Sequence, residues 1–157
     1  MQKITTFLTY QAGAEDAVTL YTSLFPRSRV LKTTHYGASG PGRPGSVMTI
    51  TFELDGQPFV ALNGGPSFSF SQGISLSVTC ETQAELDLLW EGLAAGGKEI
   101  QCGWLTDRFG VSWQIVPAKL PELIGDPDAA KAKRTMDAML KMVKLDIAAL
   151  QRAHDGF

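Results

Sequence analysis

Histidine and cysteine, the side chains that build most zinc centres, are scarce in this sequence. Its 157 residues include two histidines and two cysteines, Cys80 and Cys102, which do not form a Cys-x-x-Cys pair. A typical zinc site and histidine-rich catalysis are therefore disfavoured. With so few cysteines, we expect two reduced, buried thiols, and the alternative of a disulfide between them stays open.

An excess of charge of either sign is also missing. The chain has 14 basic and 16 acidic residues, which gives a formal net charge of −2. Nucleic-acid binding needs a clearly basic face, so we expect no nucleic-acid partner. No apolar run approaches the ~18 residues of a membrane span, and the N-terminus lacks the apolar region of a signal peptide. We expect a cytoplasmic protein with no membrane partner.

The sequence does contain enough apolar material for a folded core. Apolar residues make up 44% of the chain and charged residues 19%, a balance typical of globular proteins. Since this length suits one ordinary domain, we expect residues 1–157 to form a single domain.

The first half of the chain alternates between strand and helix patterns. Residues 4–10 are rich in β-branched and aromatic side chains and predict a strand. Residues 14–25 place apolar side chains at helical spacing, and Pro26 ends the helix. The glycine- and proline-rich segment 37–45 cannot hold a regular element, so we expect a mobile loop there. Further strands are predicted over residues 29–36, 47–54 and 58–63.

The same order of elements then restarts. A strand, a helix and two more strands are predicted over residues 74–80, 83–94, 99–105 and 111–116. Ile4 aligns with Ile74 at an offset of 70 residues, whereas Gly56 aligns with Gly110 at an offset of 54. The smaller offset places extra residues in the first half. We therefore expect two repeats, over about residues 3–66 and 72–117.

Residues 126–153 predict one long helix outside the repeats. Asp126 is a capping acid, and Pro127 suits the first helical position. The apolar side chains of this helix fall on one stripe, made of Met136, Leu140, Val143, Ile147 and Leu150. We expect this stripe to be buried on the domain or on a partner chain.

Several motifs carry a resemblance to known proteins. They are Thr5-Thr6-Phe7-Leu8, Leu62-Asn63-Gly64-Gly65-Pro66 and Thr106-Asp107-Arg108-Phe109-Gly110-Val111-Ser112-Trp113-Gln114. With the repeat, they resemble the vicinal-oxygen-chelate superfamily of glyoxalase I and bleomycin-resistance proteins, and more narrowly its PhnB-like family. That family is often labelled by similarity to 3-demethylubiquinone-9 3-methyltransferase. The resemblance implies an α+β fold, in which two βαβββ repeats form a curved mixed sheet, here with an added C-terminal helix.

In metal-dependent members of this superfamily, four strands each supply one ligand that faces into a cup. The repeat and strand alternation place Thr6, Val60 or Leu62, Leu76 and Gln114 at these positions. Two neutral oxygen donors and two aliphatic side chains will not hold a divalent ion. We therefore expect no metal and no cofactor.

The cup-facing side chains are instead candidates for contact with a small molecule. The candidates are Thr6, Leu8, Leu62, Leu76, Trp104 and Gln114. Gln114 could orient a ligand through its amide, or it could be a buried glutamine bonded to neighbouring backbone. Trp113 has the opposite parity to Gln114, so we expect it to pack beneath the helices.

Three functions remain open. The first, which we favour, is metal-free binding of a small apolar or aromatic molecule. The second is an enzyme of the glyoxalase or dioxygenase type, which would need a metal. The third is a non-catalytic dimeric scaffold, since the resemblance implies a homodimer. A methyltransferase activity has no support, because only Gly13 stands where a typical methyltransferase carries a glycine-rich turn.

Overall fold

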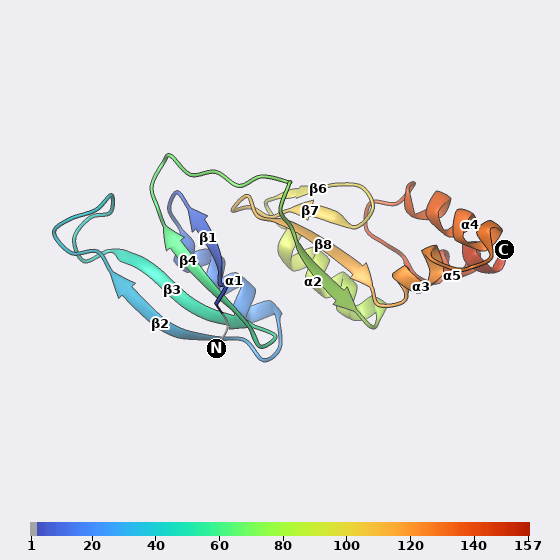
Figure 1. Ribbon diagram of the computed structural model, residues 1–157, viewed down its shortest axis with the longest axis horizontal. Helices are drawn as coiled ribbons and strands as arrows, with labels where there is room; N and C mark the ends of the chain where they lie inside the picture. The colour runs from blue at the N-terminus through green and yellow to red at the C-terminus, as the bar shows by residue number, and fades with distance from the viewer. Residues whose placement is uncertain (1–2) are drawn as a thin grey trace. The chain divides into compact units, whose positions relative to one another are not determined.

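The computed structural model describes residues 3–157, which divide into two compact units (Figure 1). The first unit ends at Phe70, and the second spans Ser71–Phe157. The boundary lies between the two predicted repeats. Across the described residues, no helix is both long and apolar enough to cross a membrane.

The first unit has the predicted order of one strand, one helix and three strands. Its sheet is mixed, with strand order β1-β4-β3-β2, and β1 and β4 are parallel. Gly13 precedes the helix and supplies no side-chain cap, so Asn63 at the end of β4 accepts the Ala14 N–H at 2.9 Å. The elements are β1 (Thr6–Tyr10), α1 (Ala14–Leu24), β2 (Arg29–His35), β3 (Val47–Leu54) and β4 (Gln57–Asn63).

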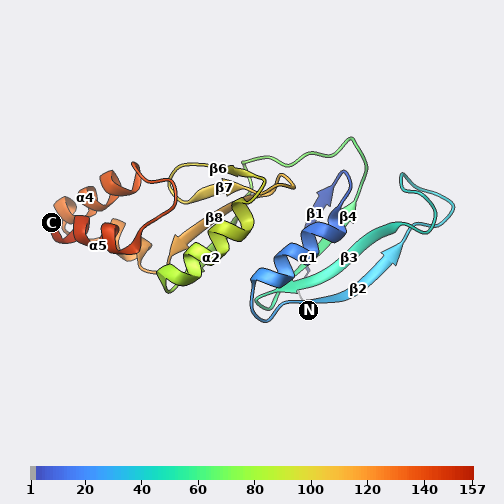
Figure 2. The ribbon, with the colours of Figure 1, turned by 180° about the vertical axis from the view of Figure 1, so that it is seen from behind.

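Helix α1 covers one face of this sheet (Figure 2). The buried Tyr10 hydroxyl donates to the buried Tyr21 hydroxyl at 3.3 Å, which shows which face of β1 points toward α1. The core between helix and sheet consists of Leu8, Tyr10, Ala14, Ala17, Val18, Tyr21, Ile50, Phe52, Phe59 and Ala61.

The glycine-rich loop of residues 37–45 is anchored by backbone hydrogen bonds at its base and by packing against the Tyr36 ring. Tyr36 N–H donates to the Ser46 carbonyl and Gly45 N–H to the Tyr36 carbonyl, both at 2.8 Å. Gly42 lies on the Tyr36 ring so closely that a Cβ there would stand 2.1 Å from a ring carbon. A larger residue at this position would push the loop away. The predicted mobility of the loop stays a prediction.

The second unit repeats this order in a second mixed sheet, β5-β8-β7-β6, with β5 and β8 parallel. Thr82 caps its helix, because Oγ1 accepts the Glu85 N–H at 3.2 Å. The single strand predicted over residues 99–105 is instead two short strands, since Cys102 and Gly103 adopt positive φ angles of 62° and 83°. The elements are β5 (Leu76–Cys80), α2 (Gln83–Ala94), β6 (Lys98–Glu99), β7 (Trp104–Thr106) and β8 (Ser112–Pro117).

A buried carboxylate fixes the turn between β7 and β8. One oxygen of Asp107 accepts the N–H groups of Phe109 and Val111 at 2.9 and 3.0 Å. The other oxygen accepts Trp113 Nε1–H at 2.9 Å. Trp113 is buried among the residues beneath α2, as its strand parity predicted. The Asp107 carboxylate therefore bonds both to the turn and to a tryptophan of the core.

Both cysteines are free thiols. Cys80 is buried, and this burial, with Glu85 nearby, raises its pKa to about 12. Cys102 is only partly buried, so the prediction of two buried thiols is correct for Cys80 alone.

The single long helix predicted over residues 126–153 is wrong. The segment contains two helices, α4 (Ala129–Met139) and α5 (Ile147–Asp155), and a short helix α3 (Leu120–Ile124) precedes it. Asp128 rather than Asp126 caps α4. The helix breaks after α4 because the carbonyls of Met142 and Val143 accept the N–H groups of Cys102 and Gly103, at 2.9 and 2.8 Å. Competition from the second unit's own loop thus outweighs helical periodicity.

Gln83 at the start of α2 also stabilises the non-helical segment between α4 and α5. Its amide nitrogen donates to the Leu145 carbonyl at 3.1 Å, and its amide oxygen accepts the Ile147 N–H at 2.8 Å. Leu145 is completely buried, whereas Leu140 and Val143 of the predicted stripe are 53% and 40% exposed. The stripe is therefore not fully buried on the domain itself, and its burial on a partner chain stays a prediction.

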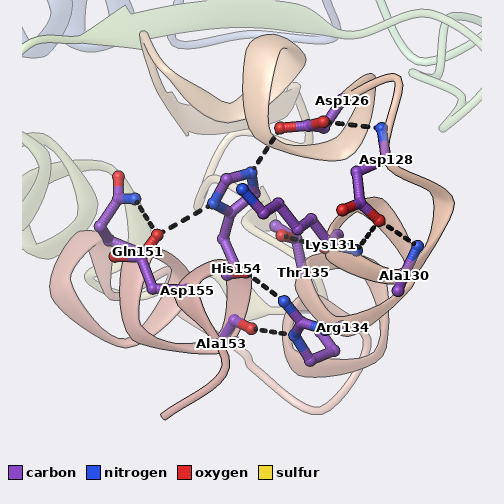
Figure 3. A network of polar contacts seen from close by, with 10 residues as sticks. All are labelled: Asp126, Asp128, Ala130, Lys131, Arg134, Thr135, Gln151, Ala153, His154 and Asp155. Atoms are coloured by element: carbon purple, nitrogen blue, oxygen red, sulfur yellow. Dashed lines mark hydrogen bonds and ion pairs between the residues drawn. The ribbon is translucent and has the colours of Figure 1, made fainter.

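A polar network around His154 connects α5 to the segment before α4 (Figure 3). His154 Nε2 lies 2.8 Å from an Asp126 oxygen, and Nδ1 lies 3.1 Å from an Asp155 oxygen. Arg134 of α4 donates to the carbonyls of Ala153 and His154 at 3.0 and 2.7 Å. Hydrogen bonds to Asp155 and Asp126 raise the pKa of His154 above its ordinary value of 6.5.

Replacing His154 by glutamine should remove a pH dependence of stability. Because the pKa of His154 is raised, its contribution is complete below 6.5 and is lost as the pH rises through the raised value. Hydrogen bonds lower the pKa of both Asp126 and Asp155 from 3.8, so their contribution disappears only as the pH falls below that value. We expect wild-type urea midpoints to fall between about pH 6 and about pH 8.5, and those of His154→Gln to change less.

The exposed His35 provides the matched control for this measurement. His35→Gln should keep the wild-type fall in midpoint over the same pH range. An equal fall in His154→Gln and wild type would show that the network does not contribute.

Replacing Asp107 by asparagine should destabilise the protein by about 2 kcal/mol, because an amide cannot accept all three of the buried N–H groups. Urea denaturation followed by circular dichroism measures the change. The exposed carboxylate of Asp16 supplies the control, since Asp16→Asn should shift stability by no more than about 0.5 kcal/mol. A similarly small effect of Asp107→Asn would contradict the role of this turn.

Candidate functional site

Each sheet turns one face toward its own helix and the other face away from it (Figures 1 and 2). Strand pairing carries these faces across each sheet, because directly paired residues point to the same side. Phe59 and Ala61 are on the helix face of the first sheet, and Trp113 and Ile115 are on that of the second. The candidate ligand contacts can be sorted by this rule.

Three of the six predicted cup residues lie on the wrong face. Thr6 is paired with Phe59 and Leu8 with Ala61, so both point toward α1. Leu76 is paired with Trp113 and points toward α2. The repeat correctly matched Thr6 with Leu76, but the parity assigned to both first strands was reversed.

The other three predicted residues lie on the faces that point away from the helices. Leu62 is on this face of the first sheet, where its pairing with Thr9 and Thr49 places those two threonines beside it. Trp104 and Gln114 are on the corresponding face of the second sheet and are paired with each other. The structure thus brings two of the candidates together, on neighbouring strands of one unit.

Trp104 and Gln114 form a half-buried pair with unused hydrogen-bonding groups. Gln114 Nε2 donates to Ser75 Oγ at 2.9 Å, so the amide is held by a side chain rather than by neighbouring backbone. Within residues 3–157, neither Gln114 Oε1 nor Trp104 Nε1–H has a protein partner. The pair therefore presents one acceptor, one donor and an indole ring on the same face.

Ser112 extends this face but is closed off from solvent. It is paired with Thr106 and is 2% exposed. Its hydroxyl is the one buried side-chain polar atom without a hydrogen-bond partner in the described part of the chain. Since it is covered, it cannot contact a ligand that approaches from solvent.

The face of the second sheet that carries Gln114 does not offer the ligands of a divalent ion. Once the parity is corrected, the β5 side chains on the face of Gln114 are Ser77 and Thr79. Hydroxyl and amide groups alone are a poor donor set for zinc, iron or nickel. Over residues 3–157, no group of three or more histidine, cysteine, aspartate or glutamate side chains could hold a metal.

The family described as 3-demethylubiquinone-9 3-methyltransferase matches residues 2–116 of this chain. Helices α3, α4 and α5 lie beyond the end of that match. A comparison with curated proteins found no match.

Solved structures with a similar fold include relatives of the same description. A putative 3-demethylubiquinone-9 3-methyltransferase, the PhnB protein of Bacillus cereus, is 40% identical, with a TM-score of 0.69 over 74% of this chain and 100% of its own. A Pseudomonas aeruginosa protein is 21% identical, with a TM-score of 0.62 over 74% of this chain and 98% of its own.

A glyoxylase/bleomycin resistance protein/dioxygenase domain from Frankia sp. EAN1pec is 19% identical, with a TM-score of 0.43 over 72% of this chain and 89% of its own. The family match and the Bacillus cereus relative are sufficient for assignment. The chain belongs to the PhnB-like, 3-demethylubiquinone-9 3-methyltransferase-like family and has an α+β fold with two mixed sheets.

Proposed function

We propose that this protein binds a small aromatic molecule without a metal, on the face of the second sheet that points away from α2. The observation that carries this proposal is the Trp104–Gln114 pair, whose indole N–H and amide carbonyl have no protein partner within residues 3–157. Half-buried polar groups of this kind can gain hydrogen bonds from a ligand without first breaking protein contacts.

The geometry of the pair indicates what kind of ligand it favours. An indole offers a broad apolar surface for an aromatic ring, and offset or edge-to-face ring pairs add about 0.5–1.5 kcal/mol beyond burial. Because Ser75 holds the amide nitrogen of Gln114, its carbonyl is available to accept a hydroxyl or N–H of the ligand. A ring with a polar substituent fits better than a simple alkane.

Two catalytic alternatives have less support. A glyoxalase or dioxygenase activity would require a metal, and the donor set on these faces is unsuitable. The methyltransferase activity in the family description would call for a doubly wound parallel sheet with a glycine-rich first turn. Here each sheet contains antiparallel pairs, and Gly13 alone occupies that turn.

We also propose that the protein is a cytoplasmic homodimer. The free thiols of Cys80 and Cys102 suit a reducing compartment. The face of the first sheet that points away from α1 carries Phe7, which is 55% exposed and paired with Val60, and it also carries Leu62. An apolar sheet face of this kind favours cover by another surface, and a second copy of the chain can supply it.

Sedimentation velocity tests the dimer. The full chain should sediment as a species of twice its mass of 16.9 kDa. Phe7→Glu should shift the equilibrium toward the monomer, because it places a charge in the apolar face. Leu88→Gln is the control, since Leu88 is 60% exposed on α2 and should not matter. A monomeric wild type, or a Phe7→Glu dimer of unchanged affinity, would contradict the proposal.

A thermal shift measurement with 2-naphthol tests the ligand site, with cyclohexanol as the non-aromatic comparison. At about 100 times its dissociation constant, a ligand adds about 2.7 kcal/mol to folded-state stability. We expect 2-naphthol to raise the melting temperature of the wild type and of Leu88→Gln. Gln114→Met and Trp104→Leu should each weaken binding about tenfold, through loss of a hydrogen bond and of the ring contact.

The proposal fails if either substitution leaves the 2-naphthol affinity unchanged, or if cyclohexanol stabilises the protein equally well. Elemental analysis of the purified protein addresses the alternative. Stoichiometric zinc, nickel or iron would favour a metal-dependent enzyme instead.

A further inference from the structure

The first unit contains a pocket of about 230 Å³ where β1 and β4 end and α1 begins. These parallel strands end at the same level, because Tyr10 is the register partner of Asn63. The carboxyl ends of parallel strands, next to a helix N-terminus, commonly bind ligands in α/β proteins. None of the six candidate contacts predicted from sequence lines this pocket.

Asn63 makes the walls of this pocket rigid. Its Oδ1 accepts the Ala14 N–H at 2.9 Å, and its Nδ2 donates to Glu15 Oε1 at 2.6 Å and to the Val47 carbonyl at 3.0 Å. The Tyr36 hydroxyl donates to the Asn63 carbonyl, and Gly42 lies against the Tyr36 ring. The pocket is therefore formed before any ligand arrives.

The hydrogen-bonding groups of the lining are unequally used. Each side-chain donor atom in the lining already bonds to the protein, and only the second N–H of Gln11 Nε2 is left over: the donor atoms are Gln11 Nε2, Tyr36 Oη, Ser46 Oγ and Asn63 Nδ2. Two side-chain acceptors, Gln11 Oε1 and Glu15 Oε2, have no protein partner within residues 3–157. The side chains of the pocket thus offer mainly acceptors, which favours a ligand that brings donors.

The formal charge of the lining residues also favours a ligand that carries donors. Glu15 carries the only formal charge among the lining residues, and it has no ion-pair partner in the described part of the chain. The positive end of the α1 dipole already faces Glu15 and Asp16 in the first turn. An anion would meet these two carboxylates, so a cation is favoured.

We propose that this pocket binds a small organic cation, an alkylammonium or guanidinium group, with Glu15 as its counter-ion and Gln11 Oε1 as a second acceptor. The volume of about 230 Å³ is below the roughly 300–1,000 Å³ typical for drug-sized ligands, so the ligand is small. The site shares no residue with the Trp104–Gln114 pair and does not depend on the aromatic-ligand proposal.

Titration of the ¹⁵N-labelled full chain with butylammonium chloride, followed by amide chemical shifts, tests this site. Saturable shifts should centre on residues 11–15 and on Ser46. Sodium butyrate, which has the same alkyl chain and the opposite charge, and butanol should not reproduce them. Glu15→Gln keeps an acceptor for Asn63 but removes the charge, and it should weaken butylammonium binding by about tenfold or more.

Asp16→Asn is the matched control, because Asp16 is the adjacent exposed carboxylate and does not line the pocket. It should bind butylammonium within about twofold of wild type, as expected for a screened surface charge. Gly42→Ala provides a variant in which the charge is kept and the loop is displaced from Tyr36, and it should also weaken binding. Absence of saturable shifts, equal binding of butyrate, or unchanged affinity in Glu15→Gln would each overturn the proposal.

Discussion

Burial of one sheet face beneath one helix is the constraint on which the rest of each unit depends. Tyr10 and Trp113 point toward α1 and α2 because their faces are the ones covered, and strand alternation then sends every second side chain to the opposite face. Those remaining positions cannot join the helix-facing core. Trp104 and Gln114 are left there as a pair with a free donor and a free acceptor, so the proposed ligand surface results from how the core is built.

Side chains at strand ends fix the connections that this layout requires. Asn63 ends β4 and caps α1 in place of the missing cap at Gly13. Asp107 directly follows β7 and accepts hydrogen bonds from the next turn and from Trp113. Each places a polar group where backbone N–H groups would otherwise lack partners, a condition that is costly in a buried position. In the first unit the same arrangement uses every donor of Asn63, and the neighbouring Glu15 is left with one unpaired oxygen.

Much of the fold could be predicted from local patterns, because α1, α2 and most strands have clear periodicity and clear end signals. The direction of the Thr6 and Leu8 side chains could not be predicted, because each face of β1 carries both polar and apolar side chains. Only the contact with α1 shows which face is covered. The break after α4 was also hidden, since it depends on N–H groups of Cys102 and Gly103, about 40 residues earlier in the chain. The acceptor pocket requires Gln11, Tyr36 and Asn63 to converge, and no sequence spacing indicates that.

The two proposed sites differ because their surroundings leave different groups unused. On the second sheet, a tryptophan ring and one neutral amide favour a ligand whose binding comes mainly from ring contact and desolvation, so salt should affect it little. In the first unit, Glu15 faces a pocket without a counter-charge, so binding there should weaken as ionic strength rises. The difference in salt dependence follows from the charge of Glu15. Family membership predicts neither ligand, because the fold sets only the positions at which such groups can be left unpaired.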